Sequence, residues 1–203
     1  MQEDRLPTQP EAEELLAWAA GRNPGPWVDH SKTAARAARQ IAMACGMNPE
    51  RCHVLGLLHD IGRYEGATAL RHVLAGHDLM LDRGYAKAAQ VCLTHSFPDK
   101  DINQFSGAMD CDAEQLGRIR RLLEQAAYDD EIRLIQLCDA ISLTNGVCLM
   151  EKRLVDVALR HGVHDGTMRK WQSFLALKEY FDKRCGLNLY SLFRQEIISG
   201  LLS

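Results

Sequence analysis

The chain has 203 residues, of which 46% are hydrophobic, and its 24 Lys and Arg against 27 Asp and Glu leave a formal net charge of −3. This length is typical of one domain, over residues 1–203, with enough chain to bury a substantial core. A slightly acidic chain is not expected to carry a large nucleic-acid surface. No apolar run is long enough to cross a bilayer, and the acidic N-terminus MQEDRLPTQPEAEELL has no secretory-signal pattern.

Helix signals run through almost the whole sequence, and no segment shows the strict alternation of a strand. Glycines and prolines mark several helix ends and starts, and Asp112 with Gln115 has the spacing of a capping box. The predicted helices cover residues 10–20, 30–45, 49 through the stretch VLGLLHDIGRYEG at 54–66, 68–83, 85–95, 112 onwards, 132–144, 149–161, 167–184 and 188–202. We therefore expect an all-α fold, a single-domain multi-helix bundle with a long irregular loop at SFPDKDINQFSGAMDC.

The seven cysteines form no C-x-x-C pair, and most of them have apolar neighbours in the sequence. An odd number of thiols in such surroundings is typical of small, reduced core residues. Together with the missing secretory signal, this favours a cytoplasmic protein.

Two polar side chains interrupt the apolar stretch at 54–66. His59 and Asp60 stand side by side among leucines, a valine and an isoleucine at helical spacing. A polar pair at the edge of the core is one interpretation. However, His30 begins the apolar stripe of an earlier helix, and Asp139 is in line with the buried positions of LIQLCDAISL. Buried charges are costly unless they are paired or bind a metal, so these four side chains favour a divalent metal site.

In this order, His30, the His59-Asp60 pair and Asp139 resemble the H…HD…D pattern of the HD-domain superfamily of metal-dependent phosphohydrolases. The phrase LLHDIGR is close to the usual wording around the doublet. The resemblance spans about residues 28–145, and the helices at 149–202 are expected to pack on this region. It implies an all-helical HD domain in which the four residues bind one metal ion and Asp60 bridges to a second.

Superfamily members with two metals, such as the HD-GYP cyclic-dinucleotide phosphodiesterases, add one histidine from each of two intervening helices. His95, at the end of a helix with a buried face, is one candidate, and a helix-capping role is its alternative. His72 and His77 are five residues apart, about 140° around a helix, so both do not easily face one ion. The wording from His72 through Gly76 to Met80 resembles that of binuclear members. We therefore expect His72 with His95, rather than His77 with His95, to complete a binuclear site.

Arg63 follows Asp60 by three residues, within one helical turn. A guanidinium matches phosphate oxygens, and the resemblance implies a basic residue here that contacts the substrate phosphate. A surface arginine paired with Glu65 or another acid is the alternative. Arg153 is a further substrate-binding candidate, and a solvated helix face is its alternative.

The resemblance implies a small-molecule phosphomonoester or phosphodiester as substrate, first of all a nucleotide. A metal-bound hydroxide would attack the phosphorus atom, while Asp60 bridges the ions and Arg63 neutralises charge on the phosphoryl oxygens. One or two divalent ions are expected, iron first, although Mn, Co, Ni and Zn suit the same ligands.

Two other functions stay open. myo-Inositol oxygenase and related C–H-cleaving oxygenases hold a diiron pair with a similar HD arrangement, so four histidines and two aspartates do not separate an oxygenase from a hydrolase. A metal-binding regulatory module without turnover is the third possibility, and the intact ligand set argues against it. The sequence identifies neither the substrate nor the oligomeric state.

Overall fold

The structure is a computed structural model that describes residues 5–201. Over this range the chain forms ten α-helices, three short 3-10 helices and one two-stranded hairpin, which confirms the predicted all-α fold. The α-helices are α1 (Gln9–Arg22), α2 (Trp27–Ala44), α3 (Pro49–Leu58), α4 (Arg71–Asp82), α5 (Ala86–Thr94), α6 (Ala113–Gln125), α7 (Asp130–Ile141), α8 (Met150–His161), α9 (Thr167–Cys185) and α10 (Arg194–Leu201). The 3-10 helices are η1 (Ile61–Glu65), η2 (Ile102–Gln104) and η3 (Leu189–Phe193), and the strands are β1 (Ser142–Leu143) and β2 (Gly146–Val147). The first four residues of the N-terminal segment and the predicted helix end at Leu202 lie outside the described residues.

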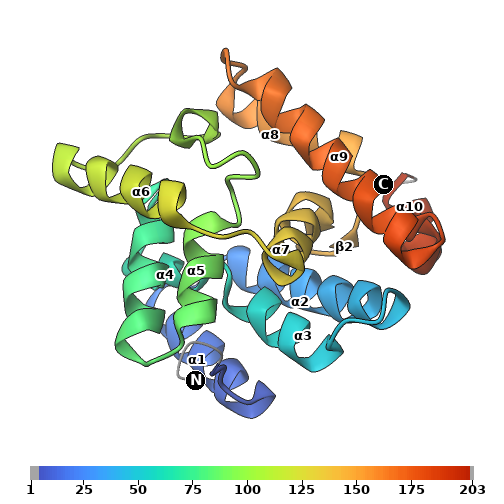
Figure 1. Cartoon of the computed structure of the whole chain (residues 1–203), viewed down its shortest axis with the longest axis horizontal. Coiled ribbons are helices and arrows are strands. Elements are labelled where there is room, and N and C mark those ends of the chain that lie inside the picture. Colours follow the sequence, from blue (N-terminus) through green and yellow to red (C-terminus); the bar gives the residue numbers. More distant parts are fainter. Residues whose placement is uncertain (1–4, 202–203) are drawn as a thin grey trace.

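Helix α7 lies near the middle of the molecule (Figure 1), with α1 to α3 on one side of it and α8 to α10 on the other. The main hydrophobic core gathers where α2, α3 and α7 meet, around the fully buried Ile41, Leu55 and Ile135. A second, smaller core contains Phe97 and Ile119, between α6 and the chain that follows α5. The apolar stripes predicted from the sequence are thus what holds the helices together.

Side-chain caps explain where several helices begin. The predicted capping box is confirmed at α6, because the amide of Gln115 donates to Asp112 Oδ1 at 2.8 Å and the amide of Asp112 donates to Gln115 Oε1 at 3.0 Å. Thr8 and Glu11 form an equivalent box at α1. Each box satisfies backbone donors that have no partner inside the helix.

Some predicted helix bounds are wrong. Helix α1 continues through Gly21 to Arg22, since a single glycine weakens a helix without ending it. Helix α4 begins at Arg71 instead of residue 68. The carboxylate of Asp110 accepts the backbone amides of Ala69 at 2.7 Å and Arg71 at 2.9 Å, so the long loop, and not a further helical turn, holds this segment. The last predicted helix is divided into η3 and α10.

The hairpin was not predicted. Helix α7 ends at Ile141, three residues before the expected end at Thr144, and the next two residues pair antiparallel with β2. The two turn residues are Thr144 and Asn145, and Gly146, the first residue of β2, has a φ of 142°. Asn-Gly between short apolar runs is a strong hairpin signal. The segment LTNGV therefore predicts a hairpin, but the apolar helical pattern before it favoured a longer helix.

The helix predicted for residues 54–66 ends at Leu58, so His59 and Asp60 lie in the turn that joins α3 to η1. Two close backbone contacts explain this turn. A Cβ added to Gly56 would lie 2.5 Å from Ala35 Cα in α2. A Cβ added to Gly62 would lie 2.0 Å from the carbonyl oxygen of His72 in α4. Only glycine permits such approaches, and they press the turn against both α2 and α4.

The C-terminal helices are tied to the rest of the chain by a charged pair. Arg36 of α2 and Glu196 of α10 form two parallel hydrogen bonds of 2.7 Å each. The same carboxylate accepts the backbone amide of Val147 in β2 at 2.8 Å. Helix α9 packs against α7 and buries Phe174 and Phe181. The helices beyond residue 149 therefore form one wall of the region described next.

All seven cysteines are free thiols, and Cys92, Cys138 and Cys148 are buried while Cys45 is half-buried. No helix between residues 5 and 201 has both the length and the apolar character needed to span a membrane.

Candidate metal centre

Five buried side chains from α2, the turn after α3, α4 and the end of α5 converge on one point. His30, His59 and Asp60 form one group of potential metal ligands, and Asp60, His72 and His95 form a second. Within each group the ligand atoms lie within 4.8 Å of one another. Asp60 belongs to both groups, and its Oδ1 lies 3.1 Å from His72 Nε2 and 3.5 Å from His95 Nε2.

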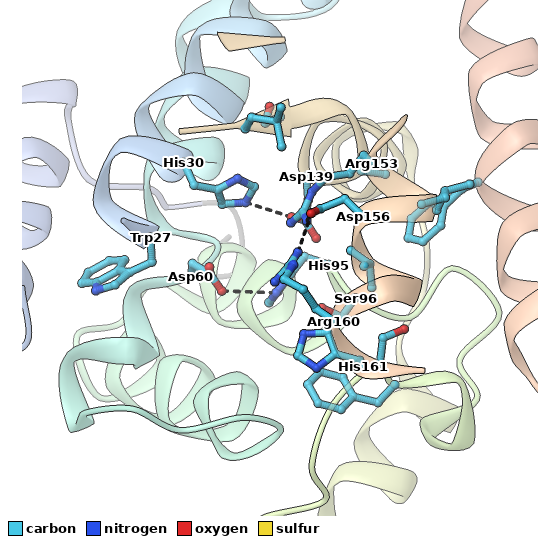
Figure 2. Close-up of a pocket in the computed structure, with 18 of the residues that line it drawn as sticks. Trp27, His30, Asp60, His95, Ser96, Asp139, Arg153, Asp156, Arg160 and His161 are labelled. Atoms are coloured by element: carbon cyan, nitrogen blue, oxygen red, sulfur yellow. Dashed lines mark hydrogen bonds and ion pairs between the residues drawn. The ribbon is translucent and has the colours of Figure 1, made fainter. Parts of the chain in front are cut away.

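Asp139 joins the cluster from α7. Its Oδ1 accepts a hydrogen bond of 2.9 Å from His30 Nε2 (Figure 2). The same oxygen lies 3.9 Å from His59 Nε2. The structure therefore brings together all six residues that the sequence singled out as metal ligands. They come from five separate parts of the fold.

Three of the imidazoles are oriented by their own backbone. The Nδ1–H groups of His59 and His95 donate to the carbonyl oxygens of Gly56 and Cys92, at 2.7 and 2.9 Å, and that of His72 donates to the carbonyl of Ala69. Each acceptor lies three residues earlier in the chain. Because a carbonyl only accepts, the Nδ1 atoms carry the protons, and the Nε2 atoms face the cluster with a free lone pair when the ring is neutral. This is the arrangement that metal-binding histidines use.

Burial and charge set the protonation states of the cluster. Burial lowers the pKa of His59, and it lowers the pKa of His95 to about 3, with the neighbouring His59 adding to the effect. Burial opposes ionisation of Asp60, but the guanidinium of Arg63 and the ring of His72 hold the pKa of this carboxyl well below its usual range. Burial likewise opposes ionisation of Asp139, and the hydrogen bond from His30 outweighs it and lowers the pKa. His59 and His95 thus favour the neutral form and both carboxylates are ionised, the forms that bind divalent metals.

Two features of the cluster fit a cation. Asp60 Oδ1 is buried and accepts no hydrogen bond within residues 5–201. The Nε2 atoms of His72 and His95 face each other at 3.3 Å, although both rings carry their proton on Nδ1. Lone pairs at this separation repel unless a positive charge lies between them. The donor set and the unsatisfied oxygen therefore suit a bound metal ion.

Arg63 lies beside the cluster in η1. Its Nε donates to Asp60 Oδ2 at 2.7 Å, and its side chain is 31% exposed. The acid that Arg63 pairs with is therefore Asp60 and not Glu65. It is Arg71 that pairs with Glu65, at 3.2 Å. Arg63 thus donates a hydrogen bond to a potential metal ligand and also lines the cavity described below.

A cavity of about 450 Å³ opens above the cluster. His30, Asp60, His72, His95 and Asp139 lie at one end of it, with Arg63. The opposite wall comes from α8 and α9, and Figure 2 shows Arg153, Asp156 and Arg160 across from the histidines. The Arg153 predicted from the sequence thus lies in the same cavity as the potential ligands. The volume is that of a typical small-molecule site.

The structure separates His72 from His77. His72 is 1% exposed and its Nε2 contacts the cluster, whereas His77 pairs with Asp78 at 2.8 Å and lies at a different surface depression, beside α5 and α6. Gly76 of α4 packs closely against Gly62 and Cys92. This contact fixes the rotation of α4 about its axis, with His72 facing Asp60.

Sequence reasoning missed several cavity residues. Lys170 and Ser142 line it from α9 and β1, and His161, to which no role was given, lines it from α8. Lysine and serine occur on every protein surface, so neither carried a signal on its own. The missed hairpin hid Ser142, because a helix continued to Thr144 places that side chain differently.

Among solved structures, two of the HD domain of the L. monocytogenes phosphodiesterase PgpH are similar to this chain. One has 15% sequence identity and a TM-score of 0.44, and covers 80% of this chain and 95% of that one. The other, in complex with cyclic-di-AMP, has 14% identity and a TM-score of 0.48, and covers 97% and 100%. No curated protein matches the sequence.

The HD domain, as a sequence family, matches residues 27–144. This range begins at the first residue of α2, ends in the hairpin after α7, and includes all six residues of the cluster. It covers more than half of the 203 residues. The chain therefore belongs to the HD-domain family.

Proposed function

We propose that this protein is a metal-dependent phosphohydrolase that cleaves a phosphomonoester or phosphodiester of a small molecule, a nucleotide first of all. His30, His59, Asp60, His72, His95 and Asp139 would hold one or two divalent ions, with iron the first candidate and Mn, Co, Ni or Zn compatible with the same ligands.

One arrangement supports this function most strongly. Asp60 is shared by two groups of ligands, and in the second group two lone-pair-bearing Nε2 atoms face each other at 3.3 Å. An aspartate with one carboxylate oxygen between two such groups is suited to bridge a pair of metal ions. Because Asp60 is also held ionised, it needs no proton loss before it acts as a ligand.

The chain's own residues then have distinct tasks. A bound divalent ion supplies Lewis acidity and makes a coordinated water acidic. Asp60 and Asp139 would provide negative charge, and the four imidazoles would provide nitrogen ligands. Arg63 holds Asp60 with its Nε and donates from Nη1 to the carbonyl oxygen of Thr68 at 3.4 Å. It also lines the cavity, where its guanidinium would donate to phosphoryl oxygens. Arg153 faces the centre from the opposite wall and would bind the rest of the substrate.

The experiment is elemental analysis of protein purified under reducing conditions, followed by a screen of the metal-loaded protein with p-nitrophenyl phosphate and bis(p-nitrophenyl) phosphate. The expected result is one to two equivalents of metal and metal-dependent release of nitrophenol, equal in air and under anaerobic conditions. Absence of hydrolysis with both esters, at full metal occupancy, contradicts the proposal. An activity that requires oxygen would identify the oxygenase alternative instead.

The ligand set has its own matched pair of variants. His72→Ala should lower the metal-to-protein ratio, because His72 Nε2 contacts Asp60. His77→Ala, on the same helix and paired with Asp78 away from the cluster, should leave the ratio unchanged. The opposite pattern would make His77 the ligand.

A further inference from the structure

The cavity wall opposite the metal centre carries three cations from the C-terminal helices, all outside the part of the chain that matches the HD domain. Arg153 and Arg160 of α8 share one carboxylate, that of Asp156, at 3.2 and 2.8 Å. Lys170 of α9 pairs with no carboxylate among residues 5–201. Positive charge therefore exceeds negative charge on this wall.

Lys170 is unusual among the lysines of this protein. It is only 9% exposed, as is Lys87. Lys87 forms ion pairs with Asp129 and Glu131, whereas the ammonium group of Lys170 makes no hydrogen bond or ion pair with any residue between 5 and 201. Its closest favourable contact is the ring of Phe174, with the ammonium nitrogen 5.8 Å from the ring centroid. Burying an unpaired ammonium group costs stability, so the packing of α9 alone does not account for it.

Two further buried donors on the same cavity lack acceptors. Arg153 uses a terminal nitrogen for Asp156, but its Nε is buried and donates to nothing in the described part of the chain. The hydroxyl of Ser142, in the fully buried residue that follows α7, is equally unsatisfied. Buried polar groups are nearly always hydrogen-bonded in native proteins. Three unsatisfied donors on one cavity therefore point to an acceptor that binds there.

Lys170 lines the same cavity as Asp139 of the metal centre and Arg153. Burial lowers its pKa to about 8, the negative charge of Asp139 opposes this effect, and the positive charge of Arg153 adds to it. Both groups are thus within electrostatic range of the same ammonium. An anion held by Lys170 would sit beside the centre, and it would be separate from the phosphate that the metal ions and Arg63 engage.

From this geometry we infer that Lys170, Arg153 and Ser142 bind a second anionic group of the substrate, a phosphate that is not the one cleaved. The inference rests on the proposed function and narrows it to phosphate esters with two phosphate groups. Lys170 is then a specificity-determining residue that the C-terminal helices add to the HD domain.

The test compares adenosine 5′-monophosphate with adenosine 3′,5′-bisphosphate, two ligands that differ in one phosphate. Their dissociation constants for the metal-loaded full chain are measured by calorimetry, and KM and kcat are measured wherever hydrolysis occurs. The wild-type protein should bind the bisphosphate about 10-fold or more tightly than the monophosphate, the size expected for charged hydrogen bonds. Lys170→Met should remove this preference and leave monophosphate binding within about twofold. Arg153→Met should reduce the preference as a second, independent variant.

Lys183→Met is the matched control, since Lys183 lies on the same helix, its side chain is 75% exposed, and it pairs with the surface residue Glu179. It should keep the preference. Equal affinity of the wild type for the two ligands overturns the inference. An equal loss of affinity for both ligands in Lys170→Met overturns it as well. Neither result affects the proposed function, which fails separately if no phosphate ester is hydrolysed.

Discussion

The two ends of the cavity hold their polar side chains by different means. At the metal centre, His59, His72 and His95 are each fixed by a carbonyl three residues earlier, within their own turn. At the opposite end, Arg153 and Lys170 reach the cavity from two helices whose position depends on tertiary packing. Three histidines of the metal centre are therefore oriented locally, whereas the directions of Arg153 and Lys170 depend on long-range contacts.

This difference has a physical consequence. A side chain fixed within its own turn keeps its direction when distant parts of the protein change, so the same ligand geometry recurs with different surroundings. A side chain placed by packing changes with every insertion or tilt of its helix. We therefore expect mutations at the first end to abolish function and mutations at the second end to redirect it.

The largest effect is expected for Asp60→Ala, which removes the one ligand that both groups share. The metal-to-protein ratio should fall by at least half, and turnover should drop by about 10³-fold or more, because the nucleophile and its electrostatic stabilisation are lost together. Elemental analysis and phosphate-ester assays measure this. Asp165→Ala, at an exposed turn, is the control. Full metal occupancy in Asp60→Ala would remove Asp60 from the ligand set.

Arg63→Ala should cut turnover of the metal-loaded protein by about 10- to 1,000-fold, the range typical for one lost charge-stabilising donor. Metal content should stay near that of the wild type, because no metal ligand is removed. Arg63→Lys should recover part of the activity, since it keeps the charge but loses the fork of donors. Unchanged kcat and KM in Arg63→Ala would assign Arg63 to the fold alone, as a partner of Asp60.

Gly62→Ala tests the contact that places Asp60. Its new methyl group would meet the carbonyl oxygen of His72 at 2.0 Å and the amide nitrogen of Gly76 at 2.4 Å. Both neighbours are backbone atoms, so we expect a loss of about 1–3 kcal/mol in the free energy of unfolding, or more, together with weaker metal binding. Gly21→Ala, with nothing within 4 Å of its added Cβ inside α1, should instead raise the melting temperature slightly. A stable Gly62→Ala protein with full metal content would contradict the role of this contact.

The smallest effect concerns the cation wall. The pKa of Lys170 is about 8 in the folded protein against 10.5 ordinarily, with burial and Arg153 lowering it and Asp139 opposing. Below pH 8 the lysine is charged in both states and its burial penalty is complete, so Lys170→Met should be more stable than wild type by up to about 3 kcal/mol at pH 7. Wild-type stability should rise between pH 8 and 10.5 and close this gap. Denaturant unfolding across this range measures it, and a gap independent of pH would show that Lys170 is not a charged buried group.

The helices and the His59-Asp60 pair were predictable because their signals are local in the sequence. His59 and Asp60 stood out because two polar residues interrupted an apolar run, and that local anomaly needed no knowledge of the tertiary structure. The helical period alone left His72 and His77 open. The expectation of His72 came from the resemblance of the wording from His72 through Gly76 to Met80. The contact of Gly62 with His72 and Gly76, which orients this helix in the structure, is a long-range feature.

The rest was out of reach for physical reasons. The end of α3 at Leu58 depends on the same close approach of backbones, and helix propensity does not describe it. Lys170 is one basic residue on a helix with several others, and only the tertiary structure buries it. The hairpin, by contrast, was readable from Asn145 and Gly146, and the apolar pattern of α7 outweighed that signal.

The carbonyl contacts of the three histidines have a consequence for how the protein handles its metal. Each ring loses its rotational freedom when the helices fold. The entropic cost of ordering these side chains is therefore part of folding and not part of metal binding. In small zinc domains the opposite holds, because binding and folding are one event. Here a chelator should strip the ions and leave the helical content unchanged, and adding metal back should restore the centre at the rate of ligand exchange, without refolding.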